Sequence, residues 1–371
     1  MQYRKLGRTG LDVSAISLGT EYLIDRPPDD VVRTVHHAID QGVNYFDLFF
    51  AQPHFRDMMG RAFKPYRDRV MLAGHLGATV HQGQSDKTRD PRLAERFFDD
   101  FLMRYNTDYV DLIFLHNSDG QEDYDLLTSE GSLLDVAKRY VREGKARYIA
   151  FSGHTVETAL QAAESGEIDV IMFPVNMAGH GIEGKRSFLQ ACVSNNIGLV
   201  AMKPFAGGGL LRDDQSIKAE GYVTGGDSRD LERNRPITPV ECLHYTLSQP
   251  GISTVVPGCK DIHELDMALA YWSASDEEKD FSAHIAQFQH YMEGQCVYCN
   301  HCLPCPSEID IGQTLRLLDE AESRLTPALQ DAYAALAANA DDCIQCGSCM
   351  ERCPFGVDVV GRMETAADLF V

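Results

Sequence analysis

Short apolar runs alternate with amphipathic segments along most of the chain. The runs are nearly continuous, as in strands that are buried on both faces of a parallel sheet. The segments between them repeat apolar residues at helical spacing. The expected strands span residues 15–20, 43–49, 70–75, 109–116, 146–154, 169–176, 199–205 and 253–258. Residues 1–17 alternate around a turn at 8–10 and predict a hairpin. The pattern predicts an α/β fold, a (β/α)8 TIM barrel over residues 1–275.

Two similar cysteine runs lie beyond the barrel. Each has three cysteines at C-x2-C-x2-C spacing, then a fourth cysteine followed by proline. The eight cysteines are Cys296, Cys299, Cys302, Cys305, Cys343, Cys346, Cys349 and Cys353. This spacing lets one loop supply three thiolates to a cubane, and in two-cluster ferredoxins the fourth comes from the other run. The runs predict two 4Fe–4S clusters, one with Cys353 as its fourth ligand and the other with Cys305.

The cluster-binding unit forms a small helical, ferredoxin-like domain over residues 276–371 in this interpretation. Helices are expected at 276–292, 313–323 and 326–340. A polar, glycine-rich insertion at 206–236 follows the seventh strand and carries Arg212, Arg229, Arg233 and Arg235. It is either a tolerated surface loop or a cover between the barrel and the clusters. The long polar segment at 77–91 is expected to shape the substrate pocket.

Polar residues stand where successive barrel strands end. Asp47 ends the second strand, His75 the third and His116 the fourth, and Ser152 and His154 end the fifth. The C-terminal ends of the strands carry the active site in barrels of this kind. A carboxylate and several imidazoles around one mouth suit either proton transfer or metal binding.

Six segments of the chain together resemble an aldo-keto reductase of the bacterial branch with a C-terminal ferredoxin-like domain. They are YRKLGRTGLDVSAISLGT, NYFD, DLIFLH, FSGHT, AMKPFAGGGLL and TVVPG. The resemblance implies hydride transfer between NADP(H) or NAD(H) and a carbonyl or hydroxyl carbon of a small organic substrate. It also implies an active site of Asp, Tyr, Lys and His, in which the tyrosine donates the proton.

The catalytic set of that family is altered in this chain. Asp47 and His116 match the family Asp and His, but Gln52 stands at the tyrosine position and His75 at the lysine position. Glutamine cannot act as a general acid, whereas imidazole titrates near neutral pH. Our hypothesis is that Asp47 and His75 form the acid/base unit and that His116 binds the substrate oxygen.

The nicotinamide pocket is retained only in part. Met172 and Met202 replace the residues that hold and stack on the ring, and Met267-Ala268 replaces Glu-Asn on the adenine side. Lys260 is expected to reach a 2′-phosphate. The resemblance implies cofactor contacts from Gly19, Thr20, Ser152, Asn176, Phe205, Gly207, Gly208, Leu210, Gly258 and Lys260.

Charge and composition restrict the partners. The formal net charge is −21, which opposes nucleic acids and anionic membranes because both attract basic surfaces. No signal-peptide core and no apolar run of about 18 residues is visible, so an oxygen-poor cytoplasm is expected. The clusters would exchange electrons with a partner such as ferredoxin or a flavoprotein. Two alternatives stay open: a metal-dependent lyase, isomerase or hydrolase using Asp47, His75 and His116, with His54 or His154 nearby, and a non-catalytic electron carrier.

Overall fold

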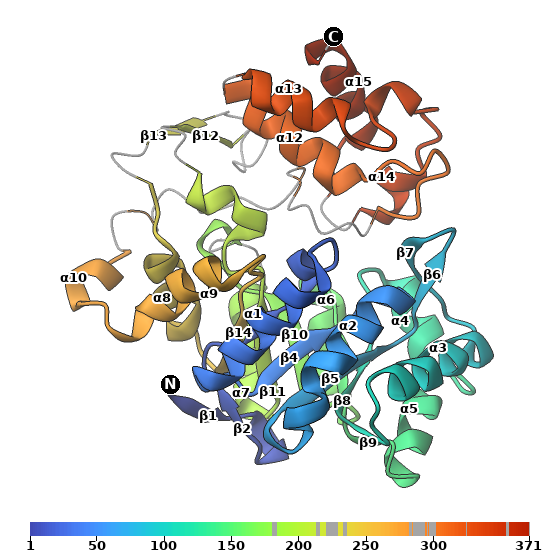
Figure 1. The fold of residues 1–371 in the computed structure, drawn as a ribbon. Coiled ribbons are helices and arrows are strands. Elements are labelled where there is room, and N and C mark those ends of the chain that lie inside the picture. Colours follow the sequence, from blue (N-terminus) through green and yellow to red (C-terminus); the bar gives the residue numbers. More distant parts are fainter. Residues whose placement is uncertain are drawn as a thin grey trace.

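The barrel is a closed parallel sheet of eight strands (Figure 1). The computed structural model describes residues 1–179, 184–212, 216–219, 229–232, 236–281, 284, 294, 296, 302–323, 325–353 and 356–370. The strands are β3 (Leu18–Gly19), β4 (Tyr45–Leu48), β5 (Met71–Leu76), β8 (Val110–Leu115), β9 (Ala146–Ser152), β10 (Val170–Pro174), β11 (Gly198–Met202) and β14 (Ile252–Val256). Parallel bridges from Ile16 to Val255 and from Gly19 to Gly258 join the first strand to the last. All eight expected strands are therefore present.

Helices surround the sheet because each presents one apolar face to it. In α5 (Leu133–Arg142), for example, Leu133, Val136, Ala137 and Tyr140 are buried, which is the spacing of a single helical face. The other barrel helices are α1 (Pro28–Asp40), α2 (Pro53–Phe63), α3 (Pro91–Arg104), α4 (Gln121–Thr128), α6 (Val156–Glu164), α7 (Lys185–Ser194), α8 (Pro239–Ser248) and α9 (Ile262–Leu269).

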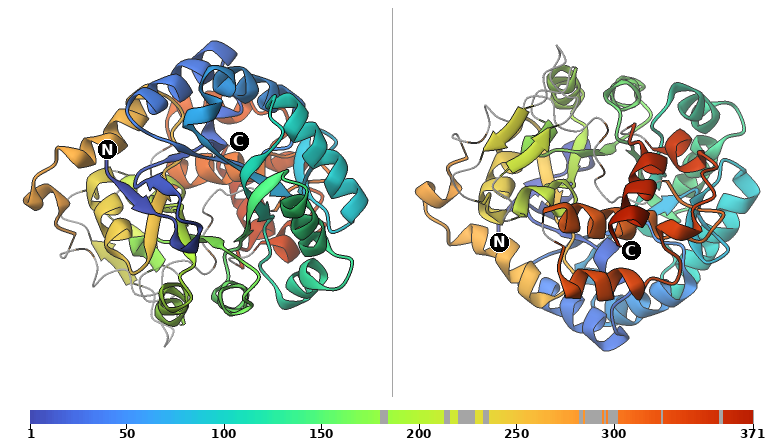
Figure 2. Two further views of the ribbon diagram at one scale, coloured as in Figure 1. Left: turned by 90° about the horizontal axis from the view of Figure 1, so that it is seen from below. Right: turned by 90° about the horizontal axis from the view of Figure 1, so that it is seen from above.

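The N-terminal hairpin covers the bottom of the barrel (Figure 2, left). It pairs β1 (Tyr3–Lys5) with β2 (Asp12–Ser14) in antiparallel register, as the sequence predicted. Leu6 and Val13 belong to the apolar cluster that fills the barrel interior, and Met172 lies in the same cluster. The bottom of the barrel is thus packed, which leaves the C-terminal ends of the strands as the open face.

A second hairpin rises from the C-terminal end of β5, where the sequence suggested only a polar loop. Its strands are β6 (Ala78–His81) and β7 (Gln84–Lys87), joined by Gln82 and Gly83, which both adopt positive φ. Of the insertion at 206–236, the structure describes a 3-10 turn, η5 (Ala206–Leu211), and the pairing of β12 (Ser216–Ala219) with β13 (Arg229–Glu232). Arg233 and Arg235 lie outside the described residues.

A small helical unit covers the open end of the barrel (Figure 2, right). It contains α12 (Ile311–Ser323), α13 (Pro327–Ala334), η7 (Ala340–Asp342), α14 (Ser348–Arg352) and α15 (Val359–Leu369), and the short α10 (Asp276–Lys279) precedes it. Most of the helix expected at 276–292 lies outside the described residues. Among the helices that are described, none has the length and apolar character needed to cross a membrane.

One predicted helix in this unit is too long. The segment 326–340 was expected to be helical throughout, but α13 ends at Ala334. Asn339 begins η7 instead, because its side chain accepts a hydrogen bond from the backbone N–H of Asp341. The Tyr333 hydroxyl accepts another from the N–H of Ala340, and its ring stacks on Phe370 at 4.1 Å. These contacts turn the chain toward Cys343.

Candidate active site and cluster pocket

Three side chains from neighbouring strands form one hydrogen-bonded chain in the barrel mouth. Nε2 of His75, in β5, lies 2.9 Å from Oδ1 of Asp47, in β4. Nδ1 of His75 lies 2.9 Å from Nδ1 of His116, which directly follows β8. The strands β4, β5 and β8 are consecutive in the sheet, which brings the three residues together. His75 and Asp47 are almost completely buried, with exposed side-chain fractions of 3% and 8%.

Aromatic packing holds this chain in place. The ring of His75 stacks on Phe114 with centroids 4.8 Å apart, and the ring of His116 stacks on Phe49 at 6.4 Å. Desolvation lowers the pKa of His116 well below its usual range, and the neighbouring His75 and Arg89 lower it further. His116 is therefore neutral at pH 7, which is the form in which an imidazole can accept a proton.

A second buried chain links three more residues at the strand ends. Nδ1 of His154 lies 3.0 Å from the carboxylate of Asp119, and Nε2 of His154 lies 2.8 Å from Nζ of Lys203. Burial lowers the pKa of His154, although Asp119 opposes that effect. Lys203 follows β11 with φ of 56°, a conformation that is uncommon for residues other than glycine. A lysine ammonium thus sits at the mouth, held by a neutral imidazole.

Gln52 lies at the start of α2 and contacts the β6–β7 hairpin. Its Nε2 donates a hydrogen bond to the Ser85 hydroxyl at 2.9 Å. Its Oε1 is buried and has no hydrogen-bond partner among the residues that the structure describes. The side chain at the family's tyrosine position therefore points toward the hairpin and leaves one acceptor unused, which is a costly arrangement unless a ligand completes it.

A carboxyl group lies against two glycines of the expected cofactor site. A Cβ atom added to Gly19 or Gly258 would come within 3 Å of the Glu21 carboxylate. Burial raises the pKa of Glu21 to about 7, with a further rise from Asp47 and an opposing effect from Lys203. Glu21 thus carries less charge near pH 7 than an exposed glutamate, which reduces its repulsion of a phosphate.

Some of the other expected cofactor residues already have hydrogen-bond or ion-pair partners within the protein, and the rest lie in or beside the turn η5. Thr20 donates a hydrogen bond to the carbonyl of Asp47, and Ser152 accepts one from the N–H of Asn117. Asn176 is bonded to Lys203 and Gly179 through both ends of its amide. Gly207 and Gly208 adopt positive φ in η5, between Phe205 and the buried Leu210. Lys260 pairs with Glu264 at the surface.

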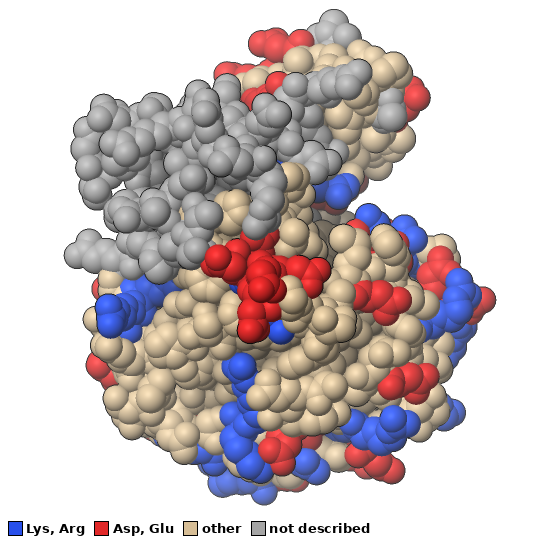
Figure 3. Space-filling model, turned by 90° about the vertical axis from the view of Figure 1, so that its left-hand side faces the viewer, with Lys and Arg blue, Asp and Glu red and all other residues tan. Residues whose placement is uncertain are grey.

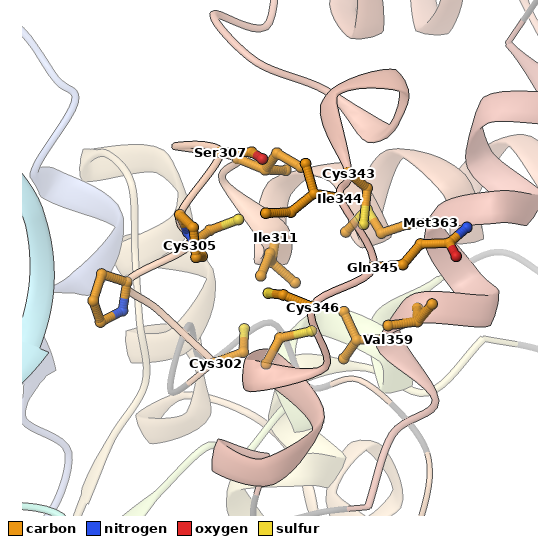
Figure 4. Close-up of a pocket in the computed structure, with 15 residues that line it drawn as sticks. Cys302, Cys305, Ser307, Ile311, Cys343, Ile344, Gln345, Cys346, Val359 and Met363 are labelled. Atoms are coloured by element: carbon orange, nitrogen blue, oxygen red, sulfur yellow. The ribbon is translucent and has the colours of Figure 1, made fainter.

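Five of the predicted cluster cysteines line one pocket in the helical unit. They are Cys302, Cys305, Cys343, Cys346 and Cys349. Figure 4 shows the labelled sulfurs of Cys302, Cys305, Cys343 and Cys346 turned toward a shared space, with Ile311 and Val359 beside it. The pKa of Cys346 is lowered by a hydrogen bond from the Ser348 backbone, which favours the thiolate that binds iron. The donor set and its apolar wall fit a cubane. Cys299 lies outside the described residues.

Comparison with known proteins identifies the barrel. Residues 15–287, well over half of the chain, match the model of the aldo/keto reductase family. The chain belongs to the aldo/keto reductase family. Residues 295–358 of this aldo/keto reductase match a 4Fe–4S dicluster domain. The protein is therefore an oxidoreductase with an appended iron–sulfur unit, as its sequence indicated.

Two curated relatives and a solved structure each match between 73% and 78% of this aldo/keto reductase. The uncharacterized oxidoreductase YqkF of Bacillus subtilis is 24% identical over 77% of this chain and 97% of its own. L-galactose dehydrogenase of Arabidopsis thaliana is 24% identical over 73% and 88%. The structure of aldo-keto reductase AKR11C1 from Bacillus halodurans aligns with a TM-score of 0.63 at 22% identity, over 78% of this chain and 96% of that one. The last likeness supports the barrel fold.

The geometry opposes a single metal ion at the barrel mouth. Asp47, His75 and His116 bond to one another in a line, so their polar atoms do not converge on one point. His54 is exposed at the start of α2, and both ring nitrogens of His154 contact Asp119 and Lys203. Throughout the described residues, no group of three or more His, Cys, Asp or Glu side chains is placed to hold one ion. A cubane does not need side chains that converge on one ion, because each of its thiolates binds a different iron.

Sequence reasoning overlooked three polar residues of the mouth. Asp119 and Lys203 follow the fourth and seventh strands, so the strand-end rule that selected His116 could also have selected them. Glu21 follows Gly19-Thr20 at the end of the first strand. The hydrogen bonds that join His154 to Asp119 and to Lys203 link residues far apart in sequence, and no local pattern indicates them.

Proposed function

We propose that this aldo/keto reductase oxidises a hydroxyl group of a small organic substrate, or reduces the matching carbonyl, by hydride exchange with a nicotinamide. Asp47, His75, His116 and Gln52 are the catalytic residues in this proposal. The observation that carries it is the hydrogen-bonded chain from Asp47 through His75 to His116. That chain occupies the strand ends where the family places its Asp, Lys and His.

The positions of the protons follow from the hydrogen-bond partners. A carboxylate only accepts, so Nε2–H of His75 donates to Asp47, and Nδ1 of the neutral His75 is then an acceptor. Nδ1–H of His116 must donate to it, which leaves Nε2 of His116 with a free lone pair. That nitrogen accepts the proton of a substrate hydroxyl, and Asp47 stabilises the positive charge that develops along the chain. This assigns the proton-accepting role to His116, with His75 and Asp47 behind it.

Gln52 has a binding role in this scheme. It cannot transfer a proton at neutral pH, but its unpartnered Oε1 can accept a hydrogen bond from a substrate hydroxyl. The nicotinamide, when bound, supplies the hydride acceptor or donor. Gly207 and Gly208 of the η5 turn and Lys260 would hold its phosphates, and Gly19, Thr20, Ser152, Asn176, Phe205, Leu210 and Gly258 would line the rest of its site.

The iron–sulfur unit connects this chemistry to a partner. We assign residues 1–275 to the barrel and 276–371 to the unit. One cluster takes Cys343, Cys346, Cys349 and Cys305, and the other takes Cys296, Cys299, Cys302 and Cys353. One pocket gathers the four cysteines of the first set, and Cys302 of the second set also lines it; the presence of Cys305 among them supports this exchange of fourth ligands. Each cluster carries one electron at a time, so the two clusters could pass the electron pair of a hydride singly to a ferredoxin or a flavoprotein only once a flavin has accepted and split that pair.

Anaerobic binding and turnover measurements test the proposal. NADH and NADPH are titrated into the purified protein while nicotinamide fluorescence and cluster absorbance are followed, and small hydroxyl compounds are then supplied with the oxidised cofactor. We expect nicotinamide binding, iron near the content of two cubanes, and turnover that falls at least about 100-fold in His116→Ala and His75→Ala, the size of a general-base contribution. Full activity in both variants, with the cluster absorbance unchanged, would rule out the imidazole chain.

A further inference from the structure

The β6–β7 hairpin touches the barrel site and the cluster unit at adjacent residues. Oε1 of Gln84 accepts a hydrogen bond from the backbone N–H of Cys305 at 2.8 Å, across 221 positions of sequence. The next residue, Ser85, accepts the hydrogen bond from Gln52. Successive side chains of a strand point to opposite faces. The hairpin therefore presents Gln84 to a cluster ligand and Ser85 to the barrel mouth.

The hairpin is anchored firmly enough to place Gln84. Nζ of Lys87, at the end of β7, donates to the carbonyl of Asn117 at 3.1 Å and pairs with Asp123. Nη2 of Arg89 donates to the same carbonyl at 2.7 Å. On the other side, Arg352 donates to the carbonyl of Pro304 at 2.6 Å. The loop that carries Cys305 is thus held between two fixed elements.

The backbone N–H that donates to Gln84 belongs to a cysteine between two prolines. Cys305 stands between Pro304 and Pro306, and proline has no backbone N–H. The amide of Cys305 is therefore the one backbone donor of this tripeptide. Amides of ligand loops can donate to cluster sulfurs, and such hydrogen bonds help to set the reduction potential. In this chain the Cys305 hydrogen is directed to Gln84 instead.

We propose that Gln84 is a positioning residue that keeps the Cys305 amide away from the cluster and thereby sets that cluster's reduction potential. The proposal rests on the cluster assignment made above. An N–H directed at a sulfur stabilises the extra electron of the reduced cluster, so capture of the N–H by Gln84 keeps the potential lower. The barrel thus tunes the cluster that takes Cys305 as a ligand.

Redox titrations of the full-length, anaerobically purified protein test this role. The variants Gln84→Ala and Gln84→Glu are compared with His81→Ala, which removes an exposed side chain of the same hairpin. The midpoint potentials of both clusters are followed by electron paramagnetic resonance, and iron is counted in each sample. Neither readout depends on a substrate or a nicotinamide.

Opposite shifts in the two variants are the expected result. Gln84→Ala frees the Cys305 amide and raises the midpoint of one cluster, while the other cluster stays at its wild-type value. Gln84→Glu keeps an acceptor and adds negative charge, so it lowers the same midpoint. His81→Ala leaves both unchanged. If Gln84→Ala loses iron, the downward shift in Gln84→Glu decides the question.

Three results would overturn the proposal. One is a pair of unchanged midpoints in both Gln84 variants, and another is an equal shift of both clusters in either variant. The third is an upward shift in Gln84→Glu. A wild-type protein without cluster iron would instead disprove the cluster assignment on which the proposal depends. Nicotinamide turnover is measured separately, so failure of the barrel chemistry would leave the Gln84 result intact.

Discussion

At the scale of single residues, His75 stands at the family's lysine position beside the retained His116, and Gln52 stands at the tyrosine position. The pKa of His116 is held well below its usual range by desolvation and by His75. A base works only when unprotonated, so activity is present above its pKa and lost as the pH falls through it. We expect kcat/KM for hydroxyl oxidation to be level from pH 7 upward and to decline only on the acid side of the ordinary histidine range.

The variant His75→Asn tests whether His75 influences the pKa of His116. It removes an imidazole whose positive charge, when that imidazole is protonated, lowers the pKa of His116, so the acid limb of the profile should move to higher pH as the rate falls. His36→Asn, a change in α1 away from the mouth, is the control and should leave the profile in place. An acid limb that stays fixed in His75→Asn would contradict the coupling of the two rings.

A buried lysine gives a separate prediction about stability. Lys185 is almost fully buried, donates a hydrogen bond to the carbonyl of Gly179 and lies over the ring of Tyr245. Burial lowers its pKa to about 7, whereas the unfolded side chain titrates near about 10.4. Between these values the unfolded state binds more protons, so stability rises with pH.

Lys185→Met should remove this pH dependence. The full effect of Lys185 between pH 7 and pH 10 is on the order of 4 kcal/mol, so the variant should gain most over wild type at or below neutral pH. Thermal unfolding at several pH values measures it, with Lys64→Met, a change of an exposed lysine, as the control. A variant whose Tm changes with pH in parallel with wild type would show that Lys185 is not the cause.

At the scale of elements, the contact between α2 and α3 depends on a glycine. A Cβ atom at Gly60 would lie 2.1 Å from the carbonyl oxygen of Arg104, a backbone atom that cannot move aside alone. Gly60→Ala should therefore force α2 away from the end of α3, at a cost of about 1–3 kcal/mol or more. Gly120→Ser is the matched control, because nothing lies near its Cβ and serine is a good first residue for a helix.

Thermal or denaturant unfolding of both variants checks this contact. Gly60→Ala should lower Tm by several degrees, and Gly120→Ser should leave it close to the wild-type value. A Gly60→Ala protein as stable as wild type would mean that the two helices can separate without loss, which would make their close approach unimportant for the fold.

The elements that the sequence predicts well are those that bury apolar side chains. The run at 110–115 is buried at every position, and an apolar run of that kind is visible without a structure. The hairpin β6–β7 escaped prediction because β7 consists of Gln84, Ser85, Asp86 and Lys87, whose polar side chains give no alternating pattern. Its role depends on contacts with Cys305 and Gln52, which lie far away in the sequence.

The sequence also indicated which residues meet in the candidate site, but not how they are arranged. The strand-end rule indicated Asp47, His75 and His116 as neighbours, and the structure brings them together. Their order in a line could not be foreseen, because it depends on ring orientations fixed by Phe114 and Phe49. Our proposal therefore moves the proton-accepting role from the Asp47–His75 pair, where the sequence hypothesis placed it, to His116.

At the scale of the whole molecule, charge bears on the choice of electron partner. The chain has 55 acidic and 34 basic residues. Figure 3 shows acidic side chains gathered in the middle of one face, directly below the residues drawn in grey, with basic side chains spread lower on the barrel. Opposite charge speeds the encounter of two proteins and like charge slows it. An acidic ferredoxin is thus a poorer match than a protein with a basic docking surface.

Electron transfer to a basic acceptor should therefore weaken as salt is added. The dithionite-reduced protein, freed of excess reductant, is mixed in a stopped-flow instrument with an oxidised c-type cytochrome of strongly basic surface, and the second-order rate constant is measured from about 10 to 300 mM salt. Screening shortens the reach of surface charge from about 30 Å to under 10 Å over this range, so the rate constant should fall at least about tenfold. A neutral quinone is the control acceptor and should react at a rate that salt hardly changes. A cytochrome rate that is level or rises with salt would mean that the surface near the clusters does not share the net negative charge of the chain, and an acidic ferredoxin would then regain its place as a partner.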